Sequence, residues 1–235
     1  MENAKLILVL LLGCSTAAQA GTYDPTYRFG SGVNIPVGNT AGWSDSETVT
    51  SGEVSGTISS IAVNLDISGG FNGSLYGYLE YDGVLVPLLN RVGVSSSSAF
   101  GYGNSGFDIT LSSSGAGNVH SYQSGSYTLN GSGQLTGTWQ PDGNNISPTS
   151  PAASFNPNPS GSGLTSFNGL SPDGTWTLFL ADVVAGSPQA QVISYGLDIA
   201  TVPEPVTTAL GIFAGLFLLG NFLRKQQTRR RGNSA

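Results

Sequence analysis

The chain of 235 residues contains few charges and almost no cysteine, histidine or lysine. Charged residues make up 9% of it, with a single cysteine, Cys14, and a single histidine, His120. Lysine is absent between Gly21 and Pro203, where two arginines and twelve acidic residues give a net charge of −10. Such a body repels nucleic acid phosphates and anionic membrane surfaces, so no nucleic acid partner is expected. The sequence also has no Cys/His metal cluster and no Gly-rich phosphate loop.

The first twenty residues have the parts of a secretory signal peptide: Lys5, an apolar core over 6–12, and a small-residue pattern that ends at Ala20. Signal peptidase cleavage after Ala20 would remove Cys14 and leave a mature chain with no thiol and no disulfide. An alternative stays open, because the residues that end at Cys14 resemble a bacterial lipobox, whose cysteine is lipidated. We predict that residues 1–20 are a signal peptide and that the protein is exported.

An uncharged run of eighteen residues covers 206–223, near the end of the chain. As a helix it would rise about 27 Å, nearly enough to cross a bilayer, so we predict a single transmembrane helix there. Pro203 and Pro205 do not fit a helix interior, so the helix should begin at or just after Pro205. The basic residues that follow would stay cytoplasmic under the positive-inside rule. They are Arg224, Lys225, Arg229, Arg230 and Arg231.

The order of these features closely resembles the PEP-CTERM sorting segment of Gram-negative bacteria. The resemblance implies that an exosortase in the inner membrane recognises the segment and processes it near the Pro-Glu-Pro motif. It also implies release or attachment at the cell surface, alongside exopolysaccharide production. An ordinary tail anchor is the alternative. The segment covers 202–235 and consists of the motif Pro203, Glu204 and Pro205, the helix over 206–223 and the basic tail over 224–235.

Between the two signals, apolar residues alternate instead of recurring at helical spacing, which predicts short β-strands. The stretch 142–163 is rich in Pro, Ser and Asn and is predicted to be a long surface loop. We therefore expect an all-β fold, a jelly-roll-like β-sandwich. Turn signals are Gly69-Gly70, Asp82-Gly83, Asp142-Gly143 and Asp173-Gly174. The predicted buried sets are Ile61, Val63, Leu65 and Ile67; Phe107, Ile109 and Leu111; Trp176, Leu178 and Leu180; and Ile193, Tyr195, Leu197 and Ile199.

Four segments of this body follow, in order, the pattern of the P domain (P/Homo B) of subtilisin-like proprotein convertases. They are "NIPVGNTAG", "GTISSIAVNLDISGGFNGSLYGYLEYDGVLVPLLNRVG", "GFDITLSS" and "FNGLSPDGTWTLFLADVVAGSPQAQVISYGLDI". The resemblance covers 27–200 of a predicted ectodomain over 21–201. It implies a jelly-roll-like sandwich that stabilises a protease domain and carries no catalytic residue. The family's Gly-x-Trp-x-Leu-x-x-x-Asp signature matches Gly174, Trp176, Leu178 and Asp182.

The sequence offers no set of residues for catalysis. A Ser-His-Asp triad needs a histidine that takes the proton of the serine. His120 lies in a Gly/Ser-rich stretch and is expected to be a surface or turn residue. No serine stands in a Gly-x-Ser-x-Gly setting after a strand. We therefore expect that the protein is not an enzyme.

A structural calcium ion is the one cofactor that the sequence leaves open. Several P domains hold calcium, which prefers carboxylate and carbonyl oxygens from loops. The alternative is that the aspartates near turns accept hydrogen bonds from neighbouring backbone amides. No Asp-x-Asp-x-Asp-Gly loop is present, so no metal ligand is predicted, and Asp182 would be the first to test. These aspartates are Asp66, Asp82, Asp108, Asp142, Asp173 and Asp182.

Tyr76 and Tyr78 would share one face of an extended strand, with Tyr81 nearby in the sequence. Aromatic rings stack on the apolar faces of sugars, so these residues could form a sugar-binding face. The alternative is that they are core residues or cross-strand pairs of a sandwich. Trp139 and Trp176 are expected in the core.

We predict a non-catalytic secreted protein of the cell surface or extracellular matrix, structural or adhesive in association with exopolysaccharide. It would pass the inner membrane, be held transiently by the C-terminal helix, and be processed by an exosortase. Two alternatives stay open. One is an accessory that binds or stabilises a separately encoded subtilisin-like protease, and the other is a carbohydrate-binding module.

Overall fold

The computed structural model describes residues 27–29, 32–50, 56–161, 163–202 and 205–232. The predicted signal peptide with Cys14 and the cleavage site at Ala20 therefore lie outside the described residues, as do Pro203 and Glu204. The body and the C-terminal segment are separate compact units, and each is described by itself.

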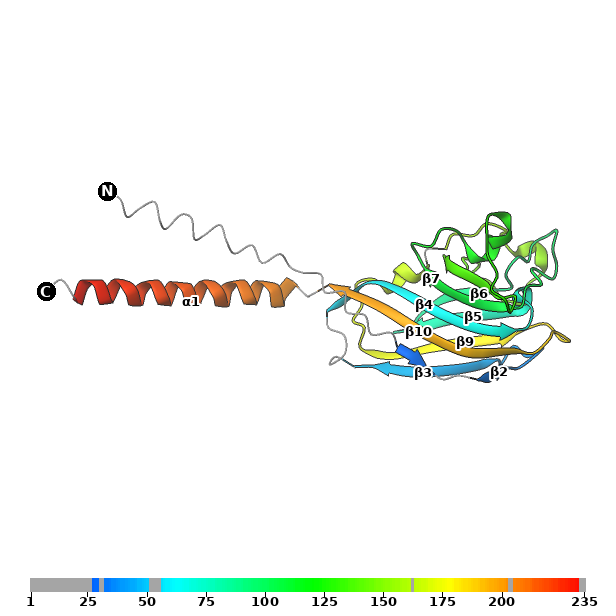
Figure 1. Ribbon diagram of the computed structural model, residues 1–235, viewed down its shortest axis with the longest axis horizontal. Coiled ribbons are helices and arrows are strands. Elements are labelled where there is room, and N and C mark those ends of the chain that lie inside the picture. The colour runs from blue at the N-terminus through cyan, green and yellow to red at the C-terminus, as the bar shows by residue number, and fades with distance from the viewer. Residues whose placement is uncertain (1–26, 30–31, 51–55, 162, 203–204, 233–235) are drawn as a thin grey trace. The chain divides into compact units, whose positions relative to one another are not determined.

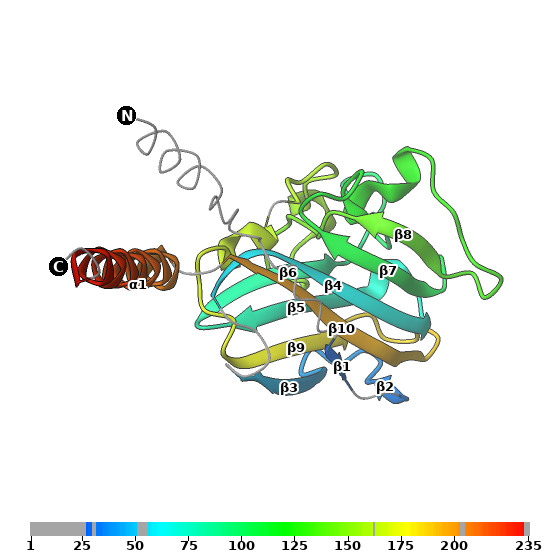
Figure 2. The same cartoon turned by 60° about the vertical axis from the view of Figure 1, so that its left-hand side comes forward.

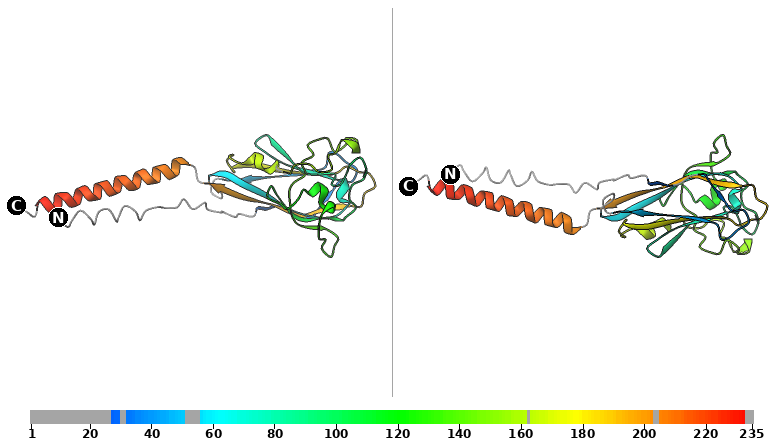
Figure 3. Two further views of the ribbon diagram at one scale, coloured as in Figure 1. Left: turned by 90° about the horizontal axis from the view of Figure 1, so that it is seen from above. Right: turned by 90° about the horizontal axis from the view of Figure 1, so that it is seen from below.

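Two β-sheets pack face to face in the body, so the prediction of an all-β sandwich is confirmed (Figures 1 and 2). Figure 3 shows the same two layers from above and below. The larger sheet has the order β1 (Tyr27–Phe29), β10 (Ala190–Val202), β4 (Thr57–Gly69), β7 (Gly106–Ser112) and β8 (Leu135–Trp139), and β2 (Val33–Ile35) also pairs with β10. The smaller sheet has the order β3 (Trp43–Val49), β9 (Gly174–Asp182), β5 (Leu75–Tyr81) and β6 (Val84–Asn90).

The apolar residues of alternate strand positions meet between the sheets and form one core. Each side chain buried there contributes roughly 1.5–3 kcal/mol of transfer free energy. Every predicted inward residue of β4, β7 and β9 is buried, as are Trp139 and Trp176. The prediction for β10 is wrong at Ile193, which is only half-buried. Val192 and Tyr195 are both buried although they are three residues apart, so the strict alternation of β10 is interrupted between them.

The Asp82-Gly83 turn closes the hairpin between β5 and β6, as the sequence predicts. Both residues have positive φ, 50° and 73°, which is the backbone that a two-residue hairpin turn of type I′ requires. Asp142-Gly143 does not close a hairpin, because it lies in the long connection between β8 and β9; Asp142 is buried there.

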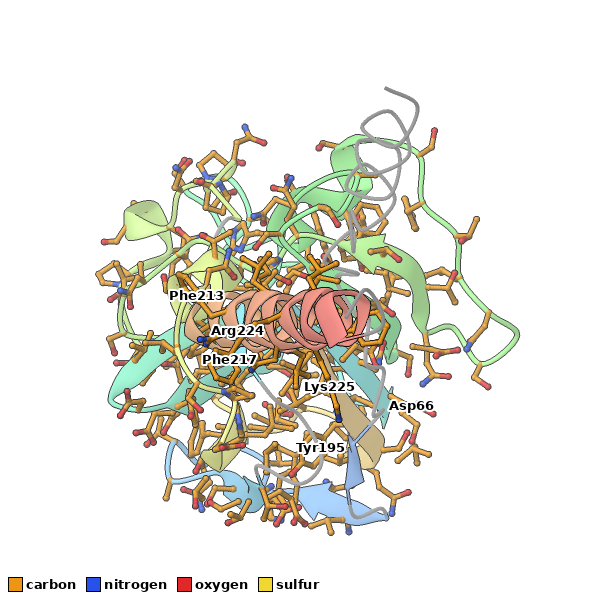
Figure 4. All side chains as sticks on the ribbon, turned by 90° about the vertical axis from the view of Figure 1, so that its left-hand side faces the viewer. Asp66, Tyr195, Phe213, Phe217, Arg224 and Lys225 are labelled. Atoms are coloured by element: carbon orange, nitrogen blue, oxygen red, sulfur yellow. The ribbon has the colours of Figure 1, made fainter. Side chains whose placement is uncertain are left out.

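Helix α1 (Pro205–Gly232) begins at Pro205, as predicted, and continues beyond residue 223. Its described side chains over 211–225 are exposed, among them Phe213 and Phe217, which Figure 4 labels. Within the described part of the chain, no helix is both long enough and apolar enough to cross a membrane. The helix over 206–223 is thus confirmed, whereas the prediction that it spans a membrane is not supported.

Candidate functional site

Alternation along β5 divides its side chains between the core and the outer face of the four-stranded sheet. Leu75 and Leu79 are buried, and Tyr76 and Tyr78 lie half-buried on the opposite side. The prediction that the two tyrosines share a face is confirmed. Tyr81 does not join them, because it points into the core and stacks on Trp176 with ring centroids 3.9 Å apart.

Phe179 of β9 completes an aromatic cluster on this outer face. It is the register partner of Tyr78, and the two rings stack with centroids 4.8 Å apart and planes 15° apart. Tyr76 meets Phe179 edge to face at 6.1 Å. Such arrangements are favourable for aromatic pairs. The rings form cross-strand pairs, which agrees with the alternative prediction for the tyrosines. Tyr76, Tyr78 and Phe179 nevertheless remain partly exposed, and a sugar-binding face requires such exposure.

The three rings form the floor of a hollow of about 470 Å³, which we call the aromatic groove. One wall is Thr40 and Ala41, from the loop before β3, and the other is residues 147–149, from the loop after β8. The hydroxyl oxygens of Ser147 and Thr149 are 2.8 Å apart. Burial, and then the nearby Tyr78, raise the pKa of Tyr76, so its hydroxyl stays neutral at physiological pH. The groove is therefore lined by apolar and hydroxyl groups without charge.

Gly42 lets the first wall approach the aromatic floor. Its φ of +56° lies in the left-handed region, and a Cβ there would stand 2.7 Å from Cζ of Phe179. Any side chain at this position would push the loop away from the ring. The backbone around Gly42 thus fixes the distance between Ala41 and the floor of the groove.

A second feature of the outer face continues from Phe179 along β9. Thr177 and Thr175 follow at alternate positions, and each meets a hydroxyl of β3. The hydroxyl oxygens of Ser46 and Thr177 are 2.8 Å apart, and those of Thr48 and Thr175 are 3.1 Å apart. We call these four residues the hydroxyl ladder.

The carboxylates of edge strand β3 point the other way. Asp45 and Glu47 alternate with the hydroxyl residues, and the hydroxyl of Tyr195 donates to Oδ2 of Asp45 at 2.9 Å. Inward-pointing charges of this kind discourage edge-to-edge pairing with other chains. Among the outward residues of β3, β5 and β9, Glu80 is thus the one charged side chain.

A buried polar network holds the loop that supplies the second wall. The side-chain amide of Asn90 donates to the carbonyl oxygens of Asn144 and Ile146, at 2.8 and 2.9 Å. Asp142 accepts the backbone N–H of Asn144 through Oδ1 at 2.9 Å. Residues 142–146 are therefore fixed from inside the protein, directly before Ser147. The predicted surface loop over 142–163 is thus buried at its start and, again, at Phe155.

The prediction that His120 lies at the surface is wrong, because its side chain is 1% exposed and belongs to the same network. Its Nδ1 lies 2.7 Å from Oδ2 of Asp142, and its Nε2 lies 2.9 Å from the carbonyl oxygen of Val94. With Asp142 as a carboxylate, both partners accept, and both ring nitrogens then donate, as in the imidazolium form. Nε2, the atom that would take a serine proton in a triad, is thus directed at a backbone carbonyl.

Two opposing effects act on the pKa of His120. Burial disfavours the charged ring, but the hydrogen bond and charge of Asp142, together with the Val94 carbonyl, outweigh burial and raise the pKa. His120 and Asp142 therefore form a buried hydrogen-bonded pair, charged when the ring is protonated, that joins three loops and supports the wall of the groove.

The aspartates considered for calcium are dispersed over the body. In the described residues, no three His, Cys, Asp or Glu side chains come together in a geometry that could hold a metal ion. Asp182 is fully buried, with Oδ1 accepting the N–H of Val184 at 3.1 Å, as expected of a turn-forming aspartate. Its Oδ2 has no hydrogen-bond partner among the described residues, and burial raises its pKa.

The predicted sorting residues belong to the C-terminal segment. Pro203 and Glu204 fall outside the described residues, and Pro205 is the first residue of α1. The basic residues Arg224, Lys225, Arg229, Arg230 and Arg231 lie on α1.

Sequence reasoning found Tyr76 and Tyr78 but missed Phe179, Thr40 and the wall over 147–149. The sequence did contain a signal for Phe179. It stands between the alternating buried residues Trp176, Leu178 and Leu180, so its side chain points to the outer face. The walls come from loops that are distant in the sequence, and no local pattern reveals their approach.

No protein-family model and no curated protein matches this chain. Among solved structures, it is similar to the complex of a serine protease of Aeromonas sobria with its chaperone, at 13% identity and a TM-score of 0.38. That match covers 77% of this chain and 28% of the other. The serine protease of Aeromonas sobria gives 13% identity and a TM-score of 0.36, over 74% of this chain and 27% of the other. The chain thus spans under a third of the length of those proteins.

Proposed function

We propose that this protein is a non-catalytic adhesive component of the cell surface or extracellular matrix, and that it binds polysaccharide in the aromatic groove. The observation that carries the proposal is the floor of three partly exposed rings between hydroxyl-bearing walls. Binding sites are typically concave and apolar, with a few polar groups that fix orientation. Sugar rings suit this arrangement, because they have apolar faces and a rim of hydroxyls.

The proposal includes export and sorting. The signal-peptide pattern over 1–20 supports export, and the order of Pro203-Glu204-Pro205, apolar helix and basic residues supports processing by an exosortase. The intact mass of the protein from the surface and medium of its host tests this part. A mass from Gly21 to a terminus near Val202 or Pro205 supports sorting, and a mass that extends to Ala235 refutes it.

Affinity electrophoresis tests the binding function. The protein from its host would migrate through native gels that contain the host's own matrix polysaccharide, and the gel should retard it. Tyr78→Ala and Phe179→Ala should each lower the apparent affinity about tenfold, since each removes a ring from the floor. Phe100→Ala is the matched control, because Phe100 is 79% exposed and does not line the groove.

The accessory role that the resemblance to P domains implies gives a different outcome. A pull-down from envelope extracts would then recover a stoichiometric subtilisin-like protease, and the polysaccharide would not retard the protein. Retardation that is lost in Tyr78→Ala, but not in Phe100→Ala, favours the adhesive role.

A further inference from the structure

The hydroxyl ladder extends the aromatic groove into a longer strip along β9. We infer that the ligand is an extended, uncharged polysaccharide chain that lies along this strip, from the aromatic groove across the hydroxyl ladder. The inference rests on the proposed function and adds the class of the ligand and its course on the protein.

The strip follows from the strand geometry. Phe179, Thr177 and Thr175 are alternate residues of β9, so they point to the same side at intervals of about 6.6 Å. The distance from Phe179 to Thr175 along the strand is then about 13 Å, longer than one sugar ring. A chain whose ring contacts the exposed atoms of Phe179 and Tyr78 therefore has further rings above Thr177 and Thr175.

The ladder has free hydrogen-bonding capacity that matches sugar hydroxyls. In each pair, Ser46 with Thr177 and Thr48 with Thr175, one hydroxyl donates to the other. A hydroxyl has one donor and two acceptor positions, so each pair keeps one donor and several acceptor positions for a ligand. Ser46, Thr48 and Thr175 are exposed, so a ligand reaches these positions without moving the backbone.

Charge decides against an acidic polysaccharide. The groove has no charged lining residue, and Glu80 is the nearby charge on the outer face of β5. The body between Gly21 and Pro203 has a net charge of −10. A ligand with carboxylates or sulfates would be repelled and would find no cationic side chain on the outward positions of β3, β5 and β9.

Native gels with defined polymers test this inference. Hydroxyethyl cellulose, dextran and galactomannan are the uncharged probes, and carboxymethyl cellulose is the charged counterpart of the first. The variant is the double substitution Thr175→Val and Thr177→Val, because valine keeps the β-branched shape that strands favour. Thr138→Val on β8 is the matched control, since Thr138 is exposed on the other sheet.

We expect at least one uncharged polymer to retard the protein and carboxymethyl cellulose to leave it unaffected. The double variant should lose about tenfold in affinity, roughly threefold for each hydroxyl, while Thr138→Val behaves as the wild type. Oligosaccharides cut from the retarding polymer should compete better as they lengthen, and the double variant should lose this dependence on length.

Different results would overturn this inference and the proposed function. Retardation that Tyr78→Ala abolishes, but that the double variant retains in full, overturns the extended course and leaves the groove as the binding site. Stronger retardation by carboxymethyl cellulose overturns the uncharged class. If neither these polymers nor the host's matrix polysaccharide retard the protein, both proposals fall.

Discussion

The two outer faces of the sandwich have hollows of similar size but opposite chemistry. The hollow on the six-stranded sheet measures about 430 Å³ and includes Asp66, labelled in Figure 4, while the aromatic groove measures about 470 Å³. On the six-stranded sheet, polar side chains bond to one another: Asn64 donates to Asp198 at 2.9 Å and accepts from Thr110 at 2.7 Å. The two hollows thus differ in their lining and not in their size, and the partly exposed rings beside available hydroxyls are the reason that we propose binding at the aromatic groove.

The two outer faces also differ in their acidic residues. Asp66 and Asp108 are direct register partners on β4 and β7, and Gln134 donates to Asp66 at 2.8 Å. The six-stranded sheet thus presents negative charge to solvent, and the four-stranded sheet presents rings and hydroxyls. We expect the first face to favour solubility and the second to make contacts.

The largest expected effect is a difference in stability between substitutions on the inner side and on the outer side of β9. Trp176→Ala should lower the free energy of unfolding by about 3–5 kcal/mol, because Trp176 is buried and stacked on Tyr81. Phe179→Ala, three residues away, should cost only about 1 kcal/mol, because its ring is half-exposed. Urea unfolding of both variants measures the difference. Equal losses would show that Phe179 belongs to the core and not to a binding face.

The fold was predictable where a local pattern decides it. Alternation in 61–67, 107–111 and 176–180 indicated the inner face of three strands, and all of these predicted residues are buried. It failed at Ile193, where the strict alternation of β10 is interrupted. The composition of 142–163 indicated a surface loop, but Asp142 and Asn144 at its start are buried against Asn90, which lies 52 residues before Asp142, so no local window contains this information.

The second expected effect is a pH dependence of stability that originates in the network behind the groove. The pKa of His120 is raised in the folded protein, so the ion pair with Asp142 contributes fully below the unfolded value of about 6.5. This contribution is lost as the pH rises through the folded pKa. Asp142 is the charged partner of the ring, Phe155 stacks on the ring, and Arg91 lies over Phe155 at 5.9 Å.

Urea unfolding midpoints between about pH 6 and pH 9 measure this effect. The midpoint should fall with rising pH in the wild type and stay flat in His120→Gln, which cannot carry the charge. A wild-type midpoint that rises over this range would contradict the buried imidazolium.

The third expected effect is a dependence of stability on the charge of Asp182. This buried carboxylate lacks a full set of hydrogen-bond partners, unlike the paired His120 and Asp142. Burial raises the pKa of Asp182, although the hydrogen bond from the Val184 N–H opposes this. The folded state then binds the proton more tightly, so stability falls as the pH rises above the unfolded value of about 4. Asp182→Asn keeps an acceptor for Val184 and should be at least as stable as the wild type at pH 7. Thermal unfolding at pH 7 and pH 4 checks this, and clear destabilisation at pH 7 would show that the charge is needed.

The smallest expected effect concerns the acidic face. Asp108→Asn removes a like charge opposite Asp66 and should stabilise the protein by about 0.5 kcal/mol at low salt. The gain should shrink at high salt, where exposed charges are screened. Polysaccharide retardation should not change, and a change would place the ligand on the six-stranded sheet.

The candidate site was predictable only in part. Tyr76 and Tyr78 follow from period-two alternation, and the exposure of Phe179 follows from its phase relative to Trp176. The walls do not, because Thr40 and Ser147 reach the groove through loops that Gly42 and the buried Asn90 position. His120 was misjudged because a Gly/Ser-rich stretch indicates exposure, and the partner that buries it, Asp142, lies 22 residues away.

Nuclear magnetic resonance of the labelled protein, titrated with the polysaccharide that retards it, tests the binding face most directly. We predict that amide shifts change at residues 40–41, 76–80, Ser147, Thr149 and 175–179, along the aromatic groove and the hydroxyl ladder. Residues 64–68 and 106–112 of the six-stranded sheet should not respond. Changes confined to β4 and β7 would contradict the assignment of binding to the four-stranded sheet.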